Sequence, residues 1–174
     1  MGVVSLFAWN WNVVLPVYST NLFDGDAAQY GLLVSLFSVG AFIGGVYTTR
    51  VTRLGRRHLM RSGWATAGAL LATAIAPTLF WAIGALILLG ATGTAFTVGA
   101  QARIQLNVAD AMSGRVMALY SVGFLGSKPL GGLLGGWITD AAGPRFAFGF
   151  GGAVCCIAIG VTMLLHRGQE APGV

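Results

Sequence analysis

The sequence is poor in charge, and acidic residues are the scarcest kind. Charged residues make up 9% of the 174 residues, Asp and Glu together number five, and 56% of the residues are hydrophobic. Ordinary soluble domains carry about a quarter charged residues. This number of charges is too small to cover a surface exposed to water. The composition therefore excludes a soluble monomer and favours a membrane protein.

Cysteine and histidine are also rare. Cys155 and Cys156 are adjacent in an apolar run, and neighbouring side chains on a helix diverge, so no disulfide is expected between them. These thiols with His58 and His166 do not make a metal-ligand set, and we expect neither a metal nor a cofactor. The sequence has no Ser-His-Asp set, paired carboxylates or phosphate-binding glycine loop in a suitable context. It therefore argues against an enzyme.

What the sequence does contain is long apolar runs. A helix needs about 20 such residues to cross roughly 30 Å of hydrocarbon. Six runs are present, at approximately 3–22, 30–49, 59–76, 79–102, 116–138 and 146–165. They predict an all-α fold, a single six-helix transmembrane domain over residues 1–174 with no linker or soluble domain.

The basic residues are concentrated between the second and third runs, where five of the ten lie between Arg50 and Arg61. If the runs are spans, one side of the membrane holds Arg50, Arg53, Arg56, Arg57, Arg61, Arg103, Arg115 and Arg167, and the other holds only Arg145. The positive-inside rule then predicts that both termini are cytoplasmic, in the plasma membrane. A nucleic-acid partner is not expected, because these arginines are not interleaved with a polar or aromatic binding surface.

Polar side chains inside the runs are costly, so they tend to face the bundle interior or a water-filled cavity. The first, fourth and fifth runs hold most of them, which predicts that these spans line a polar interior while the third and sixth face lipid. Lys128, beside Pro129, lies near the middle of the fifth run. It either faces a cavity with a functional role, or snorkels or loses its proton in place. For Asn10 and Asn12, hydrogen bonding between helices explains the residues about as well as substrate contact does.

Two further local features are predicted. Gly40 and Gly44 in the second run form a small-residue face that allows another helix to approach closely. A polar loop containing Asn107 and Asp110 is expected between Arg103 and Arg115.

The cluster of arginines also carries a motif. The segment 48–57, TTRVTRLGRR, resembles the loop signature G-x-x-x-D-R-x-G-R-R of the major facilitator superfamily. Its matching residues are Arg53, Gly55, Arg56 and Arg57, while Thr48 and Thr52 depart from the signature. The degenerate form is typical of the family's second copy, between helices 8 and 9. Thr52 in place of Asp puts a charge-relay role for the loop in doubt and leaves a basic anchor.

A second stretch is more specific. Residues 101–137 resemble helices 10 and 11 of the drug and siderophore exporter branch, in which a loop R-G-R-V-M-(A/S)-L-Y precedes a glycine-rich helix. Gly114 and Arg115 match that loop, whereas Ser113 and Lys128 are departures. Residues 10–16 are similar to helix 7 of the same branch. The resemblance covers nearly the whole chain and aligns it with helices 7 to 12, the C-terminal half.

The resemblance implies an efflux permease that moves a small amphipathic compound by alternating access, coupled to protons. Helices 7, 8, 10 and 11 would surround the cavity, with 9 and 12 outside, and the path would be lined by Lys128, Asn10, Asn12 and Gln101. Its partners would be the substrate, the lipid bilayer and a missing N-terminal six-helix half. No span contains a carboxylate, so a proton carrier would belong to that half.

Other interpretations stay open. The chain is expected to be a truncated or split gene product, since the resemblance starts at helix 7, but a homodimer of halves is possible in principle. The alternative function is a non-transporting remnant or assembly partner in the membrane. The sequence names neither the substrate nor the coupling ion.

Overall fold

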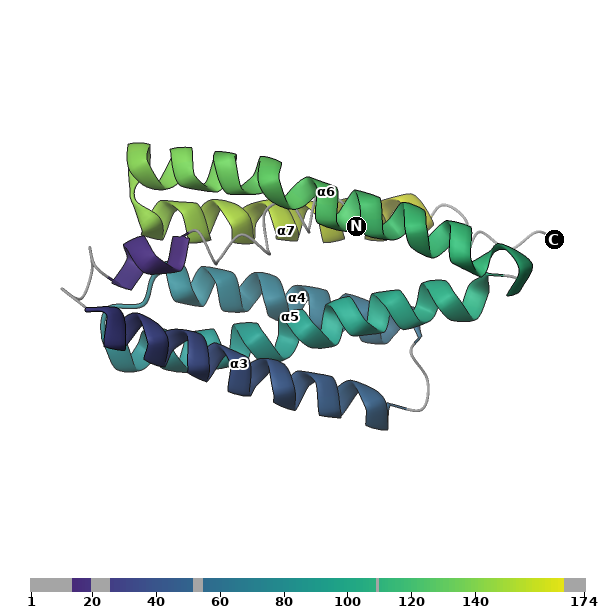
Figure 1. The fold of residues 1–174 in the computed structure, drawn as a ribbon, viewed down its shortest axis with the longest axis horizontal. Coiled ribbons are helices and arrows are strands. Elements are labelled where there is room, and N and C mark those ends of the chain that lie inside the picture. The colour runs from purple at the N-terminus through teal and green to yellow at the C-terminus, as the bar shows by residue number, and fades with distance from the viewer. Residues whose placement is uncertain (1–13, 20–25, 52–54, 109, 168–174) are drawn as a thin grey trace.

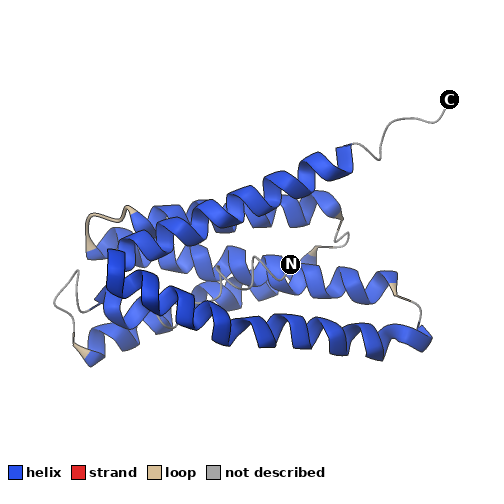
Figure 2. Ribbon diagram, turned by 90° about the horizontal axis from the view of Figure 1, so that it is seen from above, coloured by secondary structure: helices blue, strands red, loops and turns tan. Residues whose placement is uncertain are grey.

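The computed structural model of the chain describes residues 14–19, 26–51, 55–108 and 110–167. Its helices are α3 (Ala27–Arg50), α4 (Arg56–Ala74), α5 (Leu79–Asn107), α6 (Asp110–Ala142) and α7 (Pro144–Arg167). Residues 14–19 form a further helical segment. The described ranges contain no strand (Figure 2). The prediction of an all-α bundle is confirmed.

Local sequence signals set several helix ends. The carboxylate of Asp26 accepts a 2.9 Å hydrogen bond from the backbone N–H of Gln29, an N-cap that satisfies one of the free donors at the start of α3. The turn between α6 and α7 is made by Gly143, whose φ of 87° lies in the region that favours glycine. Pro144 then begins α7, at a position where the missing N–H removes no helical hydrogen bond.

The connection between α5 and α6 differs from the prediction. The polar loop expected between Arg103 and Arg115 is wrong, because α5 continues to Asn107 and α6 begins at Asp110. Hydropathy marks where an apolar run ends, but backbone hydrogen bonding decides where a helix ends. The Ala, Arg, Gln and Met residues of this segment are good helix formers and continue both helices past their apolar runs.

The helices run alternately along one long axis (Figure 1). α5 packs on both α3 and α4, and α4 also packs on α7. Among the described helices, α6 packs closely only on α7. α3, α4, α5 and α7 therefore form a compact group, called here the four-helix body, and α6 is attached to it through α7.

α3 and α5 cross with their backbones in contact. A Cβ added at Gly40 or Gly44 would overlap carbonyl groups of α5, at Ile87 and Ala91 respectively. Gly90 of α5 stands against the backbone of α3 in the same way. Small residues allow such an approach and let the two backbones pack directly. The predicted small-residue face of α3 is confirmed, and its partner is α5.

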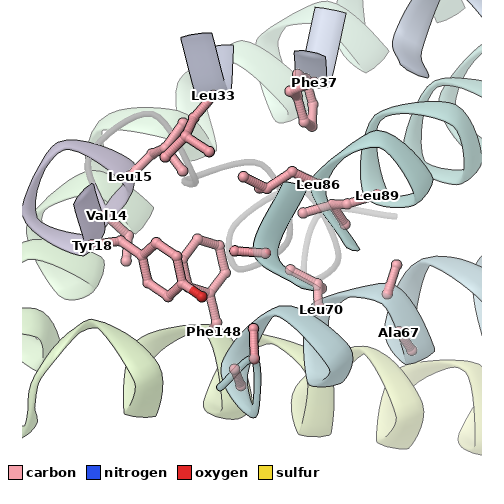
Figure 3. Close-up of a cluster of buried hydrophobic side chains, with 14 of the residues drawn as sticks. Val14, Leu15, Tyr18, Leu33, Phe37, Ala67, Leu70, Leu86, Leu89 and Phe148 are labelled. Atoms are coloured by element: carbon pink, nitrogen blue, oxygen red, sulfur yellow. The ribbon is translucent and has the colours of Figure 1, made fainter. Parts of the chain in front are cut away.

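The hydrophobic core lies where the helical segment 14–19 meets the four-helix body (Figure 3). Its larger members come from all five of these elements: Val14, Leu15, Tyr18, Leu33, Phe37, Leu70, Leu86, Leu89 and Phe148. In lipid, apolar burial between helices gives little driving force, because the tails are as apolar as the side chains. The core therefore stabilises the bundle mainly through close packing.

Tyr18 connects three elements of this core. Its side chain is fully buried, its hydroxyl donates a 2.9 Å hydrogen bond to the backbone O of Thr73, and its ring meets that of Phe148 edge-on, with centroids 5.2 Å apart. Nearby, the guanidinium of Arg145 donates a 3.1 Å bond to the backbone O of Ala76, beyond the end of α4. This end of the bundle is fixed by polar contacts to backbone oxygens.

Three described helices are long and apolar enough to cross a membrane by length and composition: Ala27–Arg50, Leu79–Leu106 and Pro144–Met163. α4 and α6 are not in this group. α4 has Arg56, Arg57 and Arg61 near its start, and α6 contains Lys128 in its middle. The division of the chain into six spans stays a prediction.

Candidate functional site

Most arginines of the described ranges lie at one end of the bundle. α3 and α5 end there, and α4 and α6 begin there (Figure 1). This basic end holds Arg50, Arg57, Arg61, Arg103 and Arg115, together with the acid Asp110. Arg145 lies at the opposite end with Asp26 and Asp140. The predicted separation of charge is therefore present along the long axis of the described structure.

The residues of the loop signature are divided between two helix starts at the basic end. Gly55 is the exposed N-cap of α4, Arg56 is the first residue of that helix, and the side chain of Arg57 is exposed. Gly114 and Arg115 are exposed near the start of α6. Arg53 lies outside the described residues. The side chains of Arg57 and Arg115 are thus presented to solvent or headgroups.

Tyr47 and His58 join α3 to α4 across the segment that carries the signature. Their rings stack with centroids 5.9 Å apart and an interplanar angle of 28°. Gly99 of α5 lies beside the same imidazole, where a Cβ would come within 3.5 Å of it. The Nε2 atom of His58 is buried and has no hydrogen-bond partner within the described ranges. No pattern in the sequence indicates this stack, since it depends on where two helices converge.

Two of the predicted path residues, Gln101 and Lys128, lie within the described ranges. Gln101 lies half-buried on α5 and its side chain hydrogen-bonds with that of Tyr120 on α6. Tyr120 was not predicted as a site residue, although it ends the segment that resembles the exporter loop. In the sequence, Tyr120 is marked only by its hydroxyl, which stands in a largely apolar stretch. The bond joins the end of α5 to α6, two helices that do not otherwise pack closely.

Lys128 lies on the same helix as Tyr120, two turns further along. At 1.5 Å per residue, the two positions are about 12 Å apart along the axis of α6. Lys128 and its neighbour Ser127 are half-buried, and both interact with other groups of the protein. They fall on the stripe of α6 that includes the buried Gly131 and Thr139, whereas the opposite face, with Leu119, Val122 and Leu133, is exposed. Gln101 and Lys128 therefore occupy different levels of the bundle.

Asn10 and Asn12, the remaining path residues, lie outside the described residues.

Four hydroxyl side chains within the predicted spans donate hydrogen bonds to the backbone of their own helices. Ser35 and Ser38 are exposed on α3 and donate to the backbone oxygens of the preceding turn, at 2.8 Å each. Thr92 and Thr97 of α5 do the same. Such self-satisfied hydroxyls cost little in an apolar setting, so they carry no strong evidence for a polar path.

The described residues do not bring three His, Cys, Asp or Glu side chains close enough to hold a metal ion. Cys155 and Cys156 are free thiols on α7, the first buried and the second half-buried. Gln101, Tyr120 and Lys128 can supply hydrogen bonds and charge.

Comparison with known proteins identifies a family. The sequence model described as Major Facilitator Superfamily matches residues 1–173. No curated protein and no solved structure matches the chain.

Proposed function

Because the chain belongs to the major facilitator superfamily, a family of membrane transporters, we propose that it is the C-terminal half of a small-molecule exporter. The all-α bundle agrees with one half of that family's fold, in which two six-helix halves move against each other around a site near the membrane midplane. The direction of transport, the half of the transporter and the path of the substrate go beyond the family match and belong to this proposal.

The assignment to the C-terminal half is supported by the form of the loop signature. Thr48 and Thr52 stand where the full signature has Gly and Asp, and this degenerate form resembles the copy between helices 8 and 9. Residues 10–16 resemble helix 7. Translation of the DNA upstream of the coding sequence tests the assignment: a six-helix half encoded there supports it, and an unrelated neighbour with an independent start signal contradicts it.

The orientation is supported by the basic end. With Arg50, Arg57, Arg61, Arg103 and Arg115 at one end and Arg145 at the other, the positive-inside rule puts the basic end in the cytoplasm and both termini on that side of the plasma membrane. A reporter that fluoresces only in the cytoplasm, fused after residue 174, tests this: a dark fusion of normal abundance would reverse the orientation.

The single observation that carries the transport path is Lys128. A cation near the middle of a helix as long as α6 costs a few kcal/mol in hydrocarbon unless polar groups or water surround it. Pro129 removes a backbone N–H from the helix and so frees a carbonyl oxygen nearby. Lys128 and Gln101, with Asn10 and Asn12, would contact an amphipathic substrate in the cavity. Since no span contains a carboxylate, proton coupling would depend on the absent half.

Exchange of Lys128 tests the path. In the assembled transporter, Lys128→Ala should reduce export of an amphipathic fluorescent dye from loaded vesicles by about tenfold or more, the effect of losing one charged contact of 1.5–3 kcal/mol. Lys128→Arg, which keeps the charge, is the matched variant and should retain most of the flux. Equal membrane abundance of all three proteins is the control. Unchanged export of every dye tested by Lys128→Ala would mean that the lysine is structural.

The alternative function is a membrane remnant or assembly partner that does not transport. It is favoured by the exposed apolar face of α6, with Leu119, Val122 and Leu133, which a half-transporter would leave to lipid or to another protein. Reconstitution of this chain alone separates the two. Dye flux above that of empty vesicles would exclude the remnant, whereas no flux alone and flux with an N-terminal half would support the exporter.

A further inference from the structure

The exposed face of α4 is a narrow stripe with an ordered composition. The side chains on this face, called here the α4 stripe, are Arg57, Arg61, Trp64, Gly68, Leu71 and Ile75. They recur every three or four residues, so they lie one above another along the helix. On the opposite side of the helix, Thr66, Ala67, Leu70 and Thr73 are buried against the rest of the bundle.

The order along the stripe matches the layers of a membrane. Two arginines come first, at the basic end, and Trp64, which is 42% exposed, follows one turn later. Leu71 and Ile75 make the far part apolar. Arginine at the headgroup level, tryptophan at the interface and apolar residues beyond are the usual order from water to hydrocarbon. From Arg57 to Gly68 the stripe rises about 16 Å, close to the depth of one leaflet.

Gly68 forms a shallow gap within the stripe. A Cβ built on Gly68 would meet no other atom within 4 Å, and the neighbouring Ala65 is also exposed and small. The helix surface between Trp64 and Leu71 is therefore low, with larger side chains above and below it. An acyl chain that lies along α4 can approach the backbone there.

The top of the stripe is basic. The acidic residues whose side chains the structure describes, Asp26 and Asp140, lie at the opposite end of the bundle. α4 has no acidic residue in its first turn, and its N-cap, Gly55, makes no side-chain cap bond. Positive side chains near a helix N-terminus are opposed by the helix dipole. An anion held by these two guanidinium groups would offset that repulsion.

We propose that the α4 stripe is a binding site for one anionic phospholipid of the leaflet at the basic end. Arg57 and Arg61, one turn apart on one face, bind the headgroup phosphate, and Trp64 lies against the glycerol region. One acyl chain follows the gap at Gly68 toward Leu71. The site is separate from the transport path on α5 and α6, and it does not depend on the direction or substrate of transport.

The same surface does not suit the other partners of an arginine pair. Free phosphate would use the charges but leave the apolar two thirds of the stripe unexplained. A protein partner would have to bring an acid to the level of Arg57 and follow a stripe one side chain wide. A phospholipid supplies both chemistries in one molecule, in the order in which the stripe presents them.

Lipid retention measured by native mass spectrometry tests the proposal. The full chain is released from detergent in the presence of phosphatidylglycerol or phosphatidylcholine, and the affinity for each is obtained from the lipid-bound fraction. The wild type should bind phosphatidylglycerol in preference to phosphatidylcholine. R57Q/R61Q should weaken binding of phosphatidylglycerol about 25-fold, about fivefold for each charge lost at the membrane surface. R57K/R61K should keep most of the affinity, since it keeps the charge.

The matched control is R50Q/R115Q, which removes two exposed arginines from the same basic end but from other helices. It should change the affinity less than twofold. An equal loss in the control would mean that the whole basic end attracts lipid without a site, and unchanged binding by R57Q/R61Q would remove the arginines from the site. If an excess of inorganic phosphate displaces phosphatidylglycerol, the ligand of the site is a free anion and not a lipid. Any of these three results overturns the proposal.

Discussion

The two sides of the bundle are held together in different ways. α3 and α5 meet backbone to backbone, with Gly40 and Gly44 against carbonyl groups of α5. α6 lies along α7, and a hydrogen bond between the side chains of Tyr120 and Gln101 connects it to α5. Close packing of small residues and hydrogen bonding are the two means by which helices associate in lipid. Close packing fixes the distance between two helices, whereas a hydrogen bond between side chains can be replaced by a bond to water or to a ligand.

This contrast between the α3–α5 crossing and the attachment of α6 indicates where the molecule can change shape. The four-helix body has a rigid crossing and a buried core, and the polar residues proposed for the path that the structure describes are divided between this body and α6. Gln101 is on the body, and Tyr120 and Lys128 are on α6. The comparison predicts that changes within the body cost stability, while changes at the α6 contact affect transport with little loss of stability.

The largest effect is expected at the α3–α5 crossing. Gly44→Leu inserts a side chain where even a Cβ overlaps the carbonyl of Ala91, so the helices must separate. The free energy of unfolding should fall by about 3 kcal/mol, the upper part of the range for overpacked sites. Unfolding in mixed micelles with increasing denaturing detergent, followed by circular dichroism, measures it.

The matched control on the same helix is Gly31→Ala. A Cβ at Gly31 meets no atom within 4 Å, and Gly31 is exposed. Alanine there should leave stability unchanged or raise it by about 0.5 kcal/mol through its helix propensity. Equal destabilisation by both variants would refute the rigid crossing.

An intermediate effect is expected at Tyr18. Tyr18→Phe removes the hydroxyl that donates to the backbone O of Thr73 but keeps the ring against Phe148. The free energy of unfolding should fall by about 1 kcal/mol, the net contribution of one buried hydrogen bond. Tyr47→Phe is the control, because Tyr47 is 57% exposed and should keep its stack on His58. A loss no larger for Tyr18→Phe than for Tyr47→Phe would show that the hydroxyl does not hold residues 14–19 to α4.

The smallest effect on stability is expected at the α5–α6 bond. Tyr120→Phe should lower the free energy of unfolding by about 0.6 kcal/mol, an average value for hydrogen bonds between membrane helices. A double-mutant cycle with Gln101→Leu measures the coupling directly, and a coupling near zero would mean that the bond does not link the helices. A coupling as large as the effect of Gly44→Leu would abolish the contrast between the body and α6.

Much of the fold follows from the sequence. The apolar runs predict all-α structure, and Gly40 and Gly44 predict a close helix contact, which the structure confirms. The loop between Arg103 and Arg115 was predicted wrongly, because hydropathy falls there while helix propensity stays high. The partner of the glycine face was not predictable, since one sequence shows which surface is small but not which helix meets it.

The candidate site is less accessible from sequence. Lys128 and Gln101 are detectable because polar side chains in apolar runs are rare, but their levels in the bundle depend on where α5 and α6 end. Tyr120 and His58 acquire their contacts from helices that converge in space. Their pairings with Gln101 and Tyr47 join residues of different helices and have no local pattern in the sequence. The roles of Lys128, Gln101, Asn10 and Asn12 in transport stay predictions.

The turn at Gly143 has a mechanical consequence. α6 is joined to α7 through this one residue, and its 33 residues extend about 50 Å from the turn to the basic end. A tilt of α6 by about 5° about that point would move its far end by about 4 Å and Tyr120, about 35 Å from the turn, by about 3 Å, enough to break the bond to Gln101 while leaving the turn almost in place. A small rotation at Gly143 would thus become a large displacement at the basic end.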